Sequence, residues 1–430
     1  MKPVLQVALD FVDLARALKL AAEAVKGGAD WLEAGTPLIK AEGLEAIRAL
    51  KKNFPAKTIV ADMKTMDVGR VEVEMASKAG ASVVGILGAA SDETIKESVM
   101  AARNYGSRII VDLIEIKDIV RRAREVEKLG ADFVGIHIPI DEQMRGNISF
   151  EIVKEVSRSV KIPVSVAGGI TSYYAASCVR SGGSIIVVGG AITKSPDARL
   201  ATLKIKRAIT KGIVVKSESY RRIGTAEDIK KVLSKVSAAN LSDALHRAAP
   251  VKGVMPVYIS GKVVGPAFTV RTSPGDWAKP VQAIDAASPG DIIVIDASGA
   301  GPAVWGELAT TSAIVKKIAG VVIYGGIRDT SDIKKLKFPS FASVVTPQAG
   351  EPKGFGEMDV VINIGGVKVA PGDWIIADED GVMVLPKESA VEFANRAMDV
   401  FEREERLRHE IKQGGKSLAE VAELLKWEKK

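Results

Sequence analysis

The sequence predicts an α/β protein in two parts, a (β/α)8 TIM barrel followed by a second α/β domain with stacked sheets. Three observations support this prediction. Eight short apolar runs recur along the first 190 residues, about 20–30 residues apart, and segments with helical apolar periodicity separate them. Glycine-containing turns precede several of the runs. Beyond residue 225 the pattern changes to glycine-rich strands separated by Pro-Gly pairs.

The eight runs predict eight parallel strands of one barrel. Helical spacing of apolar residues is clear in segments 14–25 and 119–129. Turns such as Gly28-Ala29-Asp30 and Gly130-Ala131-Asp132 supply the glycine that ends a helix before the next strand. Eight near-equal units fit a closed barrel of about 210 residues better than the alternative, a doubly wound open sheet. The predicted strands are 4–10, 31–35, 58–64, 82–88, 108–114, 133–139, 163–169 and 184–190.

Charged side chains cluster at the end of the third predicted strand, in Asp62-Met63-Lys64-Thr65-Met66-Asp67. Alternation along a strand directs Asp62 and Lys64 to the same face. Burying a carboxylate beside an ammonium is costly, so such a pair indicates a functional site. An ion pair that plugs the end of the barrel is the alternative.

In such barrels the active site lies at the carboxyl ends of the strands. Glu33 and Asp62 follow neighbouring strands, and with water they could hold Mg²⁺ in an all-oxygen site. His137 is the natural proton carrier, although a purely structural histidine is the alternative. Two glycine pairs follow strands seven and eight, where barrels commonly bind phosphate through backbone N–H groups. In chain order the strand ends are Asp10, Glu33, Asp62 with Lys64, Gly88, Asp112, His137, Gly168-Gly169 and Gly189-Gly190.

Several separated motifs in residues 1–212 resemble the 3-hexulose-6-phosphate synthase family of the orotidine-phosphate decarboxylase superfamily, whose signature is the Asp-x-Lys-x-x-Asp run. The motifs are Val7-Ala8-Leu9-Asp10, Glu33-Ala34-Gly35-Thr36-Pro37, Asp62-Met63-Lys64-Thr65-Met66-Asp67-Val68-Gly69, Val111-Asp112-Leu113-Ile114, Ala167-Gly168-Gly169-Ile170 and Val188-Gly189-Gly190-Ala191-Ile192-Thr193. The resemblance implies reversible aldol joining of formaldehyde to ribulose 5-phosphate, with Mg²⁺ or Mn²⁺. The related keto-gulonate-phosphate decarboxylase shares most of these residues and is the alternative.

The resemblance also implies roles for individual residues. Glu33 and Asp62 would hold the metal, and Lys64 would hydrogen-bond the enediolate oxygens while His137 moves the proton. Asp67 would lie at the mouth of the partner subunit's site, which implies a homodimer. Residues expected to orient Lys64 or bind the sugar phosphate are Asp10, Asp112, Gly168, Gly169, Gly189, Gly190 and Ala191.

Two departures leave the identity of the aldol acceptor open. The family usually follows the histidine with Thr-Gly-Tyr-Asp, whereas this sequence has His137-Ile138-Pro139-Ile140-Asp141. Glu115 stands where a polar amide is more usual. Both segments are expected to shape the pocket around the carbon that is attacked.

The second half is expected to be a separate domain, residues 225–430, joined to the barrel (1–212) by a linker at 213–224. Ser and Asn residues near 237–240 predict a helix start after a short helix at 229–233. Long helices are predicted at 389–412 and 417–427. The predicted strands are 263–270, 291–296, 321–324, 342–346, 359–364 and 374–377.

Five motifs stand out in the second half: Ser273-Pro274-Gly275-Asp276, Gly306-Glu307-Leu308-Ala309-Thr310, Gly325-Gly326-Ile327-Arg328-Asp329-Thr330-Ser331-Asp332, Phe338-Pro339-Ser340-Phe341-Ala342 and Thr346-Pro347. With them, residues of about 225–395 resemble the RraA-like family, which includes a proposed inhibitor of ribonuclease activity and metal-dependent pyruvate aldolases. The resemblance implies an aldolase or oxaloacetate decarboxylase acting on a pyruvate-type substrate, with Arg328 gripping it and backbone near Gly306 assisting. Glu307, Asp329 and Asp332 would be the metal ligands. A regulatory or oligomerisation module is the alternative, with Arg328 and Asp329 as an interface ion pair.

Composition agrees with two enzymatic domains. The chain has 430 residues, 47% of them apolar, which is long enough for two to three domains with cores of their own. A single cysteine, Cys178, excludes an internal disulfide framework and a Cys-based zinc site. The formal charge of +7 favours anionic ligands, but charges of both signs in 401–412 argue against nucleic acid. Without a long apolar stretch or a signal-like start, we expect a cytoplasmic homo-oligomer, a barrel dimer with an RraA-like trimer or hexamer.

Overall fold

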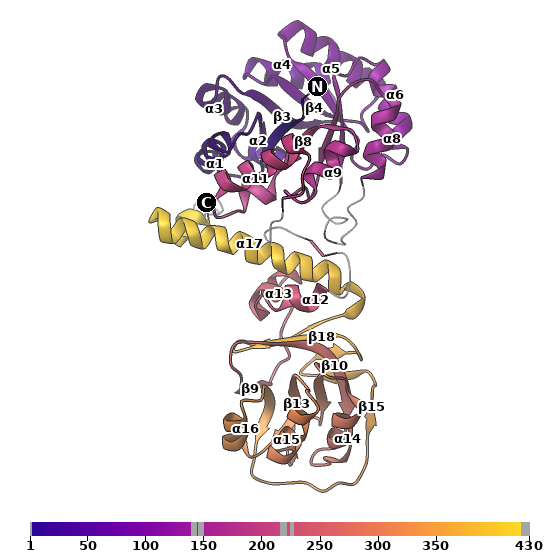
Figure 1. Cartoon of the computed structure of the whole chain (residues 1–430), viewed down its shortest axis with the longest axis vertical. Coiled ribbons are helices and arrows are strands. Elements are labelled where there is room, and N and C mark those ends of the chain that lie inside the picture. The colour runs from indigo at the N-terminus through magenta and orange to yellow at the C-terminus, as the bar shows by residue number, and fades with distance from the viewer. Residues whose placement is uncertain (1, 139–143, 145–149, 216–221, 224–227, 423–430) are drawn as a thin grey trace. The chain divides into compact units, whose positions relative to one another are not determined.

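The computed structural model describes residues 2–138, 144, 150–215, 222–223 and 228–422 (Figure 1). Its contacts divide the chain into two compact units. The first comprises Met1–Gln143, Asn147–Arg222 and Glu402–Lys430, and the second comprises Met144–Gly146 and Ile223–Phe401. The division thus assigns the last residues of the chain, from Glu402 onward, to the unit that contains the barrel.

The first unit contains the predicted barrel. Its eight strands are parallel and close into a ring in chain order, β1 to β8, with β8 pairing with β1. The expectation of a TIM barrel is therefore confirmed, and an open sheet is excluded. The strands are β1 (Val4–Leu9), β2 (Trp31–Ala34), β3 (Thr58–Thr65), β4 (Val83–Leu87), β5 (Arg108–Asp112), β6 (Phe133–His137), β7 (Val164–Ala167) and β8 (Gly183–Val188).

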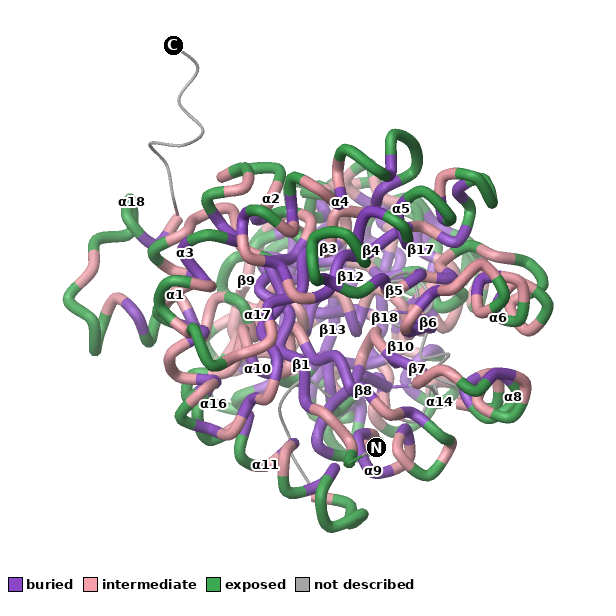
Figure 2. Tube along the Cα trace, turned by 90° about the horizontal axis from the view of Figure 1, so that it is seen from above, coloured by how far each residue is buried: buried purple, intermediate pink, exposed green. Residues whose placement is uncertain are grey.

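Helices alternate with the strands and bury one face each, so that purple and green alternate along the outer tube (Figure 2). The local sequence explains their ends: Ser91 accepts a hydrogen bond from Thr94 N at the start of α5, and Gly106 ends it at φ +74°. The helices between the strands are α1 (Leu14–Lys26), α2 (Thr36–Glu42), α3 (Glu45–Asn53), α4 (Gly69–Lys78), α5 (Asp92–Tyr105), α6 (Ile119–Lys128), α8 (Glu151–Ser159), α9 (Ala175–Arg180), α10 (Gly190–Thr193) and α11 (Ala198–Lys211).

Apolar side chains fill the amino-terminal end of the barrel interior. Trp31 and Phe133 meet edge to face there, with ring centroids 5.6 Å apart, and the Arg108 guanidinium lies over both rings. Val83 and Ile185, from β4 and β8, belong to the same buried cluster. This end of the barrel is filled by side chains, and a cavity lies towards the carboxyl ends of the strands.

The second unit is an α/β domain whose strands form one nine-stranded sheet and a separate hairpin within the described residues. The central strands β10, β11, β13 and β14 pair in parallel, while β18 and β19 extend the sheet antiparallel beside β10. The strands are β9 (Met255–Tyr258), β10 (Val263–Arg271), β11 (Ile292–Asp296), β12 (Ala303–Trp305), β13 (Gly320–Ile327), β14 (Ser340–Val345), β15 (Glu357–Met358), β18 (Trp374–Asp378) and β19 (Gly381–Leu385), with the hairpin β16 (Ile362–Ile364) and β17 (Val367–Val369).

The helices of the second half begin near the predicted residues. The predicted start at 237–240 is a capping box in which the side chains of Ser237 and Asn240 each accept from the other's backbone N–H. The long helix predicted at 389–412 is α17, and the last five residues of the helix predicted at 417–427 lie outside the described residues. No helix in the described part of the chain is long and apolar enough to cross a membrane. The helices are α12 (Ile229–Leu233), α13 (Ala238–Ala244), α14 (Ala278–Ala286), α15 (Glu307–Val315), α16 (Thr330–Leu336), the 3-10 helix η2 (Lys387–Ser389), α17 (Ala390–Gly414) and α18 (Leu418–Val421).

Candidate functional site

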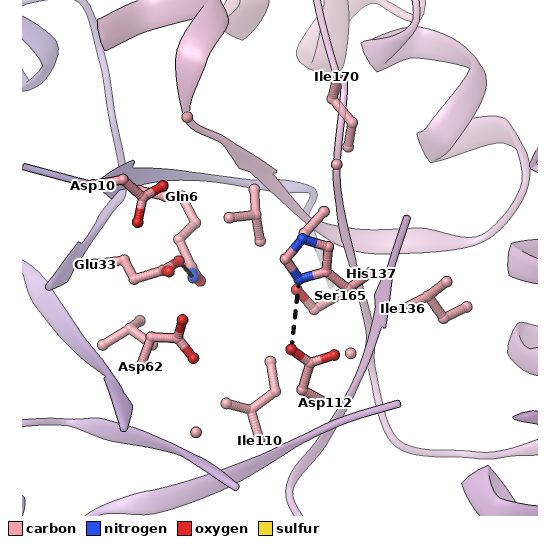
Figure 3. A pocket seen from close by; sticks show the side chains of 18 of the residues that line it. Gln6, Asp10, Glu33, Asp62, Ile110, Asp112, Ile136, His137, Ser165 and Ile170 are labelled. Atoms are coloured by element: carbon pink, nitrogen blue, oxygen red, sulfur yellow. Dashed lines mark hydrogen bonds and ion pairs between the residues drawn. The ribbon is translucent and has the colours of Figure 1, made fainter. Parts of the chain in front are cut away.

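A cavity of about 240 Å³ opens at the carboxyl ends of the barrel strands. Most of the residues predicted for the first site line it, although they come from strands far apart in the sequence. They are Asp10, Glu33, Asp62, Lys64, Asp112, His137, Gly168, Gly169, Gly189, Gly190 and Ala191. In Figure 3 the carboxylates of Asp10, Glu33 and Asp62 lie on one side of the cavity, and Asp112 and His137 lie on the other.

Lys64 lies between two carboxylates. Its Nζ is 3.2 Å from Oδ1 of Asp62 and 2.5 Å from Oδ2 of Asp112. The backbone of Lys64 is left-handed, at φ +52°, and the pairing of β3 with β4 is irregular between Ala61 and Thr65. A non-glycine residue held in this conformation is strained, and such strain is commonly found at functional sites. Burial opposes the lysine charge, but Asp62 and Asp112 raise the pKa of Lys64 above its ordinary value.

Asp112 joins Lys64 to the histidine. Nδ1 of His137 is 3.5 Å from Oδ2 of Asp112, the contact drawn as a dashed line in Figure 3. The other oxygen, Oδ1, accepts a hydrogen bond from Ile114 N at 3.0 Å. Burial opposes ionisation of Asp112, but His137 and Lys64 lower its pKa. The carboxylate of Asp112 therefore lies between Lys64 and His137 and contacts both side chains.

The opposite wall of the cavity combines three acids. Glu33 is 8% exposed, and burial together with Asp62 and Asp10 raises the pKa of Glu33 to about 8. Thr36 donates from its Oγ1 to both the backbone oxygen and Oδ2 of Asp62, at 2.8 Å each. Among the described residues no three His, Cys, Asp or Glu side chains complete a metal site by themselves. Two carboxylates suffice for Mg²⁺, which keeps several water ligands.

Asp10 lies at the mouth of the cavity against two glycines. A Cβ added to Gly35 would be 2.1 Å from Oδ1 of Asp10, and one added to Gly189 would be 3.5 Å from Oδ2. Only glycine at position 35 therefore leaves room for this carboxylate. Desolvation by the surrounding protein and the charge of Asp62 raise the pKa of Asp10.

The glycine pair after β7 has left-handed backbone, with Gly168 at φ +100° and Gly169 at φ +64°. Both residues line the cavity, as do Gly189 and Gly190 after β8. This is the position at which barrels commonly bind phosphate through backbone N–H groups. Gly88, which also ends a predicted strand, is not among the residues that line the cavity.

Asp67 does not line the cavity of its own chain. Its Oδ1 accepts from Val68 N at 2.7 Å, and Val68 is left-handed at φ +48°, an unusual conformation for a β-branched residue. Four apolar side chains near it in the sequence are about half exposed: Met66, Val68, Val71 and Met75. Of the segment that departs from the synthase pattern, Pro139, Ile140 and Asp141 lie outside the described residues.

A second cavity, of about 280 Å³, lies within the second unit. Arg328 and Asp329 line it together with Gly306, and most of its wall is apolar: Trp277, Val281, Val304, Trp305, Leu308 and Ala309. Asp329 is left-handed at φ +55°, and its Oδ2 is 3.4 Å from Nε of Arg328 and accepts from the backbone N of Glu307 at 3.1 Å. A Cβ at Gly306 would be 2.6 Å from that oxygen, so this carboxylate requires glycine there.

The other two acids predicted for this site make contacts elsewhere. Oε1 of Glu307 accepts from Oγ1 of Thr311 at 2.8 Å, and Oδ1 of Asp332 pairs with Nζ of Lys335 at 2.8 Å. Neither Glu307 nor Asp332 is among the residues that line the cavity. Within one chain, the motif therefore brings Arg328, Asp329 and Gly306 together and leaves the two flanking acids outside.

Several polar or aromatic residues at the two sites were not predicted from the sequence, among them Gln6, Thr36 and Trp277. Gln6 and Thr36 contact Glu33 and Asp62, and Trp277 lines the second cavity. A signal for Gln6 was available, because it is polar inside an apolar run and has the same alternation as Asp10. Thr36 belongs to the motif Glu33-Ala34-Gly35-Thr36-Pro37 but was given no role, and nothing local in the sequence marked Trp277.

Comparisons with known proteins match each half of the chain to a different family. Residues 3–205 match the sequence model of the orotidine 5'-phosphate decarboxylase / HUMPS family, and residues 238–384 match the RraA-like model, described as Aldolase/RraA. The 3-hexulose-6-phosphate synthase of Mycobacterium gastri is 42% identical over 205 residues, which are 48% of this chain and 99% of that protein. The synthase of Bacillus subtilis is 38% identical over 209 residues, again 48% of this chain and 99% of the relative.

Solved structures also match the second half. One of them is an unusual member of the RNase ES inhibitor RraA protein family from Streptomyces coelicolor, 30% identical, covering 44% of this chain and 98% of its own, with a TM-score of 0.39. The chain therefore belongs, through its first half, to the orotidine 5'-phosphate decarboxylase / HUMPS family and, through its second half, to the RraA-like family.

Proposed function

We propose that the barrel is a lyase that reversibly joins formaldehyde to ribulose 5-phosphate, with Mg²⁺ or Mn²⁺ as its cofactor. The observation that supports this most is the position of Lys64 between Asp62 and Asp112, with His137 beside Asp112, in a cavity lined by two glycine pairs. Relatives named 3-hexulose-6-phosphate synthase at 38–42% identity support the same reaction class.

The charge of the cavity supports a divalent cation. Four carboxylates line it against one lysine among the described residues. A sugar phosphate would be repelled by this excess of negative charge unless a cation offset it. Burial and the two neighbouring acids raise the pKa of Glu33, and a cation on Glu33 and Asp62 would stabilise the ionised form of both carboxylates.

The residues of the barrel then have complementary tasks. His137 would take the proton from C1 of ribulose 5-phosphate, leaving an enediolate, and Asp112 would orient the imidazole. Lys64 would donate hydrogen bonds to the oxygens on which negative charge develops. When bound, the cation would supply further positive charge near those oxygens. The carbanionic C1 would form the new bond to the carbon of formaldehyde, whose oxygen ends as a hydroxyl after accepting a proton.

Formaldehyde consumption with ribulose 5-phosphate and Mg²⁺ tests this proposal. Intact protein should consume formaldehyde, and both Asp62→Ala and a chelator should abolish the consumption. If intact protein consumes none but releases CO2 from 3-keto-L-gulonate 6-phosphate, the decarboxylase alternative replaces the proposal. Thr94→Ala, on the exposed start of α5, is the matched control and should keep full activity.

We further propose that the barrel works as a homodimer in which Asp67 completes the partner's site. Asp67 does not line its own cavity, and the segment that follows it carries half-exposed apolar side chains, Val68, Val71 and Met75. Mixing Asp67→Ala protein with Lys64→Met protein tests this, since a mixed dimer has one site with both residues intact. Activity should rise from near zero to about a quarter of wild type if subunits exchange at random. No recovery after verified subunit exchange would contradict it.

For the second unit we propose a metal-assisted lyase acting on a 2-oxo acid such as pyruvate or oxaloacetate. Arg328 has the forked geometry that grips a carboxylate, and most of the cavity wall beside Arg328 and Asp329 is apolar. Such a cavity suits a small acid whose carboxylate pairs with Arg328. Asp329→Ala should abolish oxaloacetate decarboxylation and pyruvate aldol turnover. Turnover that survives this change would favour the alternative, a regulatory or oligomerisation module.

A further inference from the structure

Gln6 is a polar residue inside the otherwise apolar strand β1. It is 2% exposed, lies level with Trp31 and Val187 on the neighbouring strands, and lines the barrel cavity. Its side chain thus lies deep in the cavity, below the carboxylates. A buried amide costs folding free energy unless both its donor and its acceptor find partners.

Only one side of this amide has a partner. Nε2 of Gln6 donates to Oε2 of Glu33 at 2.5 Å, and Figure 3 shows the amide directly against that carboxylate. The other amide atom, Oε1, is buried and has no hydrogen-bond partner among the described residues. This orientation is the one that an ionised Glu33 requires, as it would be when it holds a cation, because an ionised carboxylate can only accept and so selects the N–H side of the amide.

The unpaired oxygen indicates a ligand that donates hydrogen bonds. Gln6 lines the cavity, so that a small donor could reach it, and a water molecule in a polar cavity is the smallest one. Apolar residues lie level with Gln6 on both neighbouring strands, Trp31 on β2 and Val187 on β8, and both are buried. Packing alone would therefore accept a leucine or valine here.

We propose that Gln6 is a positioning residue of the metal site. Its N–H group holds Oε2 of Glu33, which leaves the second carboxylate oxygen for the cation, and its carbonyl accepts a hydrogen bond from a water molecule beside that cation. This inference rests on the metal site proposed above. Partners that orient metal ligands in this way typically change metal affinity 10- to 100-fold when they are removed.

Mn²⁺ binding to the full chain, followed by electron paramagnetic resonance, tests the proposal. All proteins carry Asp329→Ala, so that metal held by the second unit does not contribute. Gln6→Leu should weaken Mn²⁺ binding about 10-fold or more. Ser165→Ala, which changes another buried polar residue of the same cavity, should stay within twofold of the parent. Gln6→Met is a second variant, because it keeps the unbranched shape of glutamine if leucine does not fit.

The metal-free protein provides a readout independent of activity. The amide oxygen of Gln6 is already unpaired, so its loss should cost little stability. The midpoint temperature of thermal unfolding of metal-free Gln6→Leu should therefore lie within about 2 °C of the parent. Unchanged Mn²⁺ affinity in both Gln6 variants, while Asp62→Ala loses binding, would overturn the role of Gln6 alone. An equal loss in Ser165→Ala would also overturn it. If the parent binds no Mn²⁺ at all, the proposed metal site falls together with this inference.

Discussion

The two cavities of this chain assemble their polar groups in different ways. In the barrel, Asp10, Glu33, Asp62, Asp112 and His137 come from five strands and meet in one cavity. In the second unit, the predicted acids are near one another in sequence, yet only Asp329 lines the cavity beside Arg328. A closed barrel brings all strand ends to one rim, whereas Glu307 begins α15, Asp329 precedes α16 with left-handed backbone and Asp332 lies in the first turn of α16. Sequence proximity was therefore the poorer guide to spatial convergence.

The largest effect is expected for a change in the barrel cavity, which should lower formaldehyde consumption and leave the activity of the second unit intact. Lys64→Met should lower formaldehyde consumption about 10³-fold, since it removes the ammonium group that lies between Asp62 and Asp112. Lys78→Met, which changes a lysine of an exposed ion pair with Glu74, is the matched control and should retain activity. Turnover of 2-oxo acids should be unchanged in both variants. Equal losses in the two activities would contradict the independence of the sites.

The corresponding change in the second cavity should have a smaller effect on activity. Arg328→Gln should reduce 2-oxo acid turnover about 10²-fold, because a neutral amide cannot grip a carboxylate with charge and forked geometry. Formaldehyde consumption should not change. Arg271→Gln, an exposed arginine of the same unit that pairs with Glu357, provides the control for loss of positive charge. Steady-state assays of both reactions on the same preparations decide the outcome.

A third prediction concerns the stability of the second unit and its pH dependence. Burial opposes ionisation of Asp276, but backbone N–H groups of Ala278, Lys353, Gly354 and Phe355 lower its pKa. Because the folded pKa is lowered, this stabilisation is complete above the ordinary carboxyl pKa of about 3.9 and is lost as pH falls through the folded value. Asp276→Asn should cost about 2 kcal/mol of unfolding free energy at pH 7.

Urea unfolding between pH 7 and pH 3 measures the stabilisation that ionised Asp276 provides. The difference between wild type and Asp276→Asn should shrink towards the acid end of the range. Asp285→Asn, which changes an exposed acid paired with Lys316, should behave like wild type throughout. A difference that persists unchanged at pH 3 would show that the carboxylate charge is not its source.

The smallest effect is expected at the amino-terminal end of the barrel. Arg108→Gln removes a cation above Trp31 and Phe133 and should cost about 0.5–1 kcal/mol of stability. Activity should not change, because this end is packed and the cavity opens at the opposite end. Thermal unfolding and the formaldehyde assay together distinguish the two ends. A clear loss of formaldehyde consumption by folded Arg108→Gln protein would contradict the distinction between the two ends.

The barrel was predictable because its fold repeats a simple pattern. Apolar runs of strand length, separated by helical periodicity, leave few alternatives, and all eight predicted strands overlap β1 to β8. The prediction for the second half was less complete, because short strands such as β12 and β15 were missed. A strand of two or three residues carries almost no periodic signal. Pairing with β13 and β10 stabilises those strands, and that information is not local.

The sequence by itself determined the two families, the strand ends and the residue types that face the barrel cavity, because alternation and period follow from backbone geometry. Only the tertiary structure decided which polar groups meet. It placed Gln6 against Glu33, Thr36 against Asp62 and His137 beside Asp112, and it left Glu307 and Asp332 outside the second cavity. The physical reason is that hydrogen bonds and ion pairs form over a few ångströms, and only packing of the whole unit brings distant segments within that range.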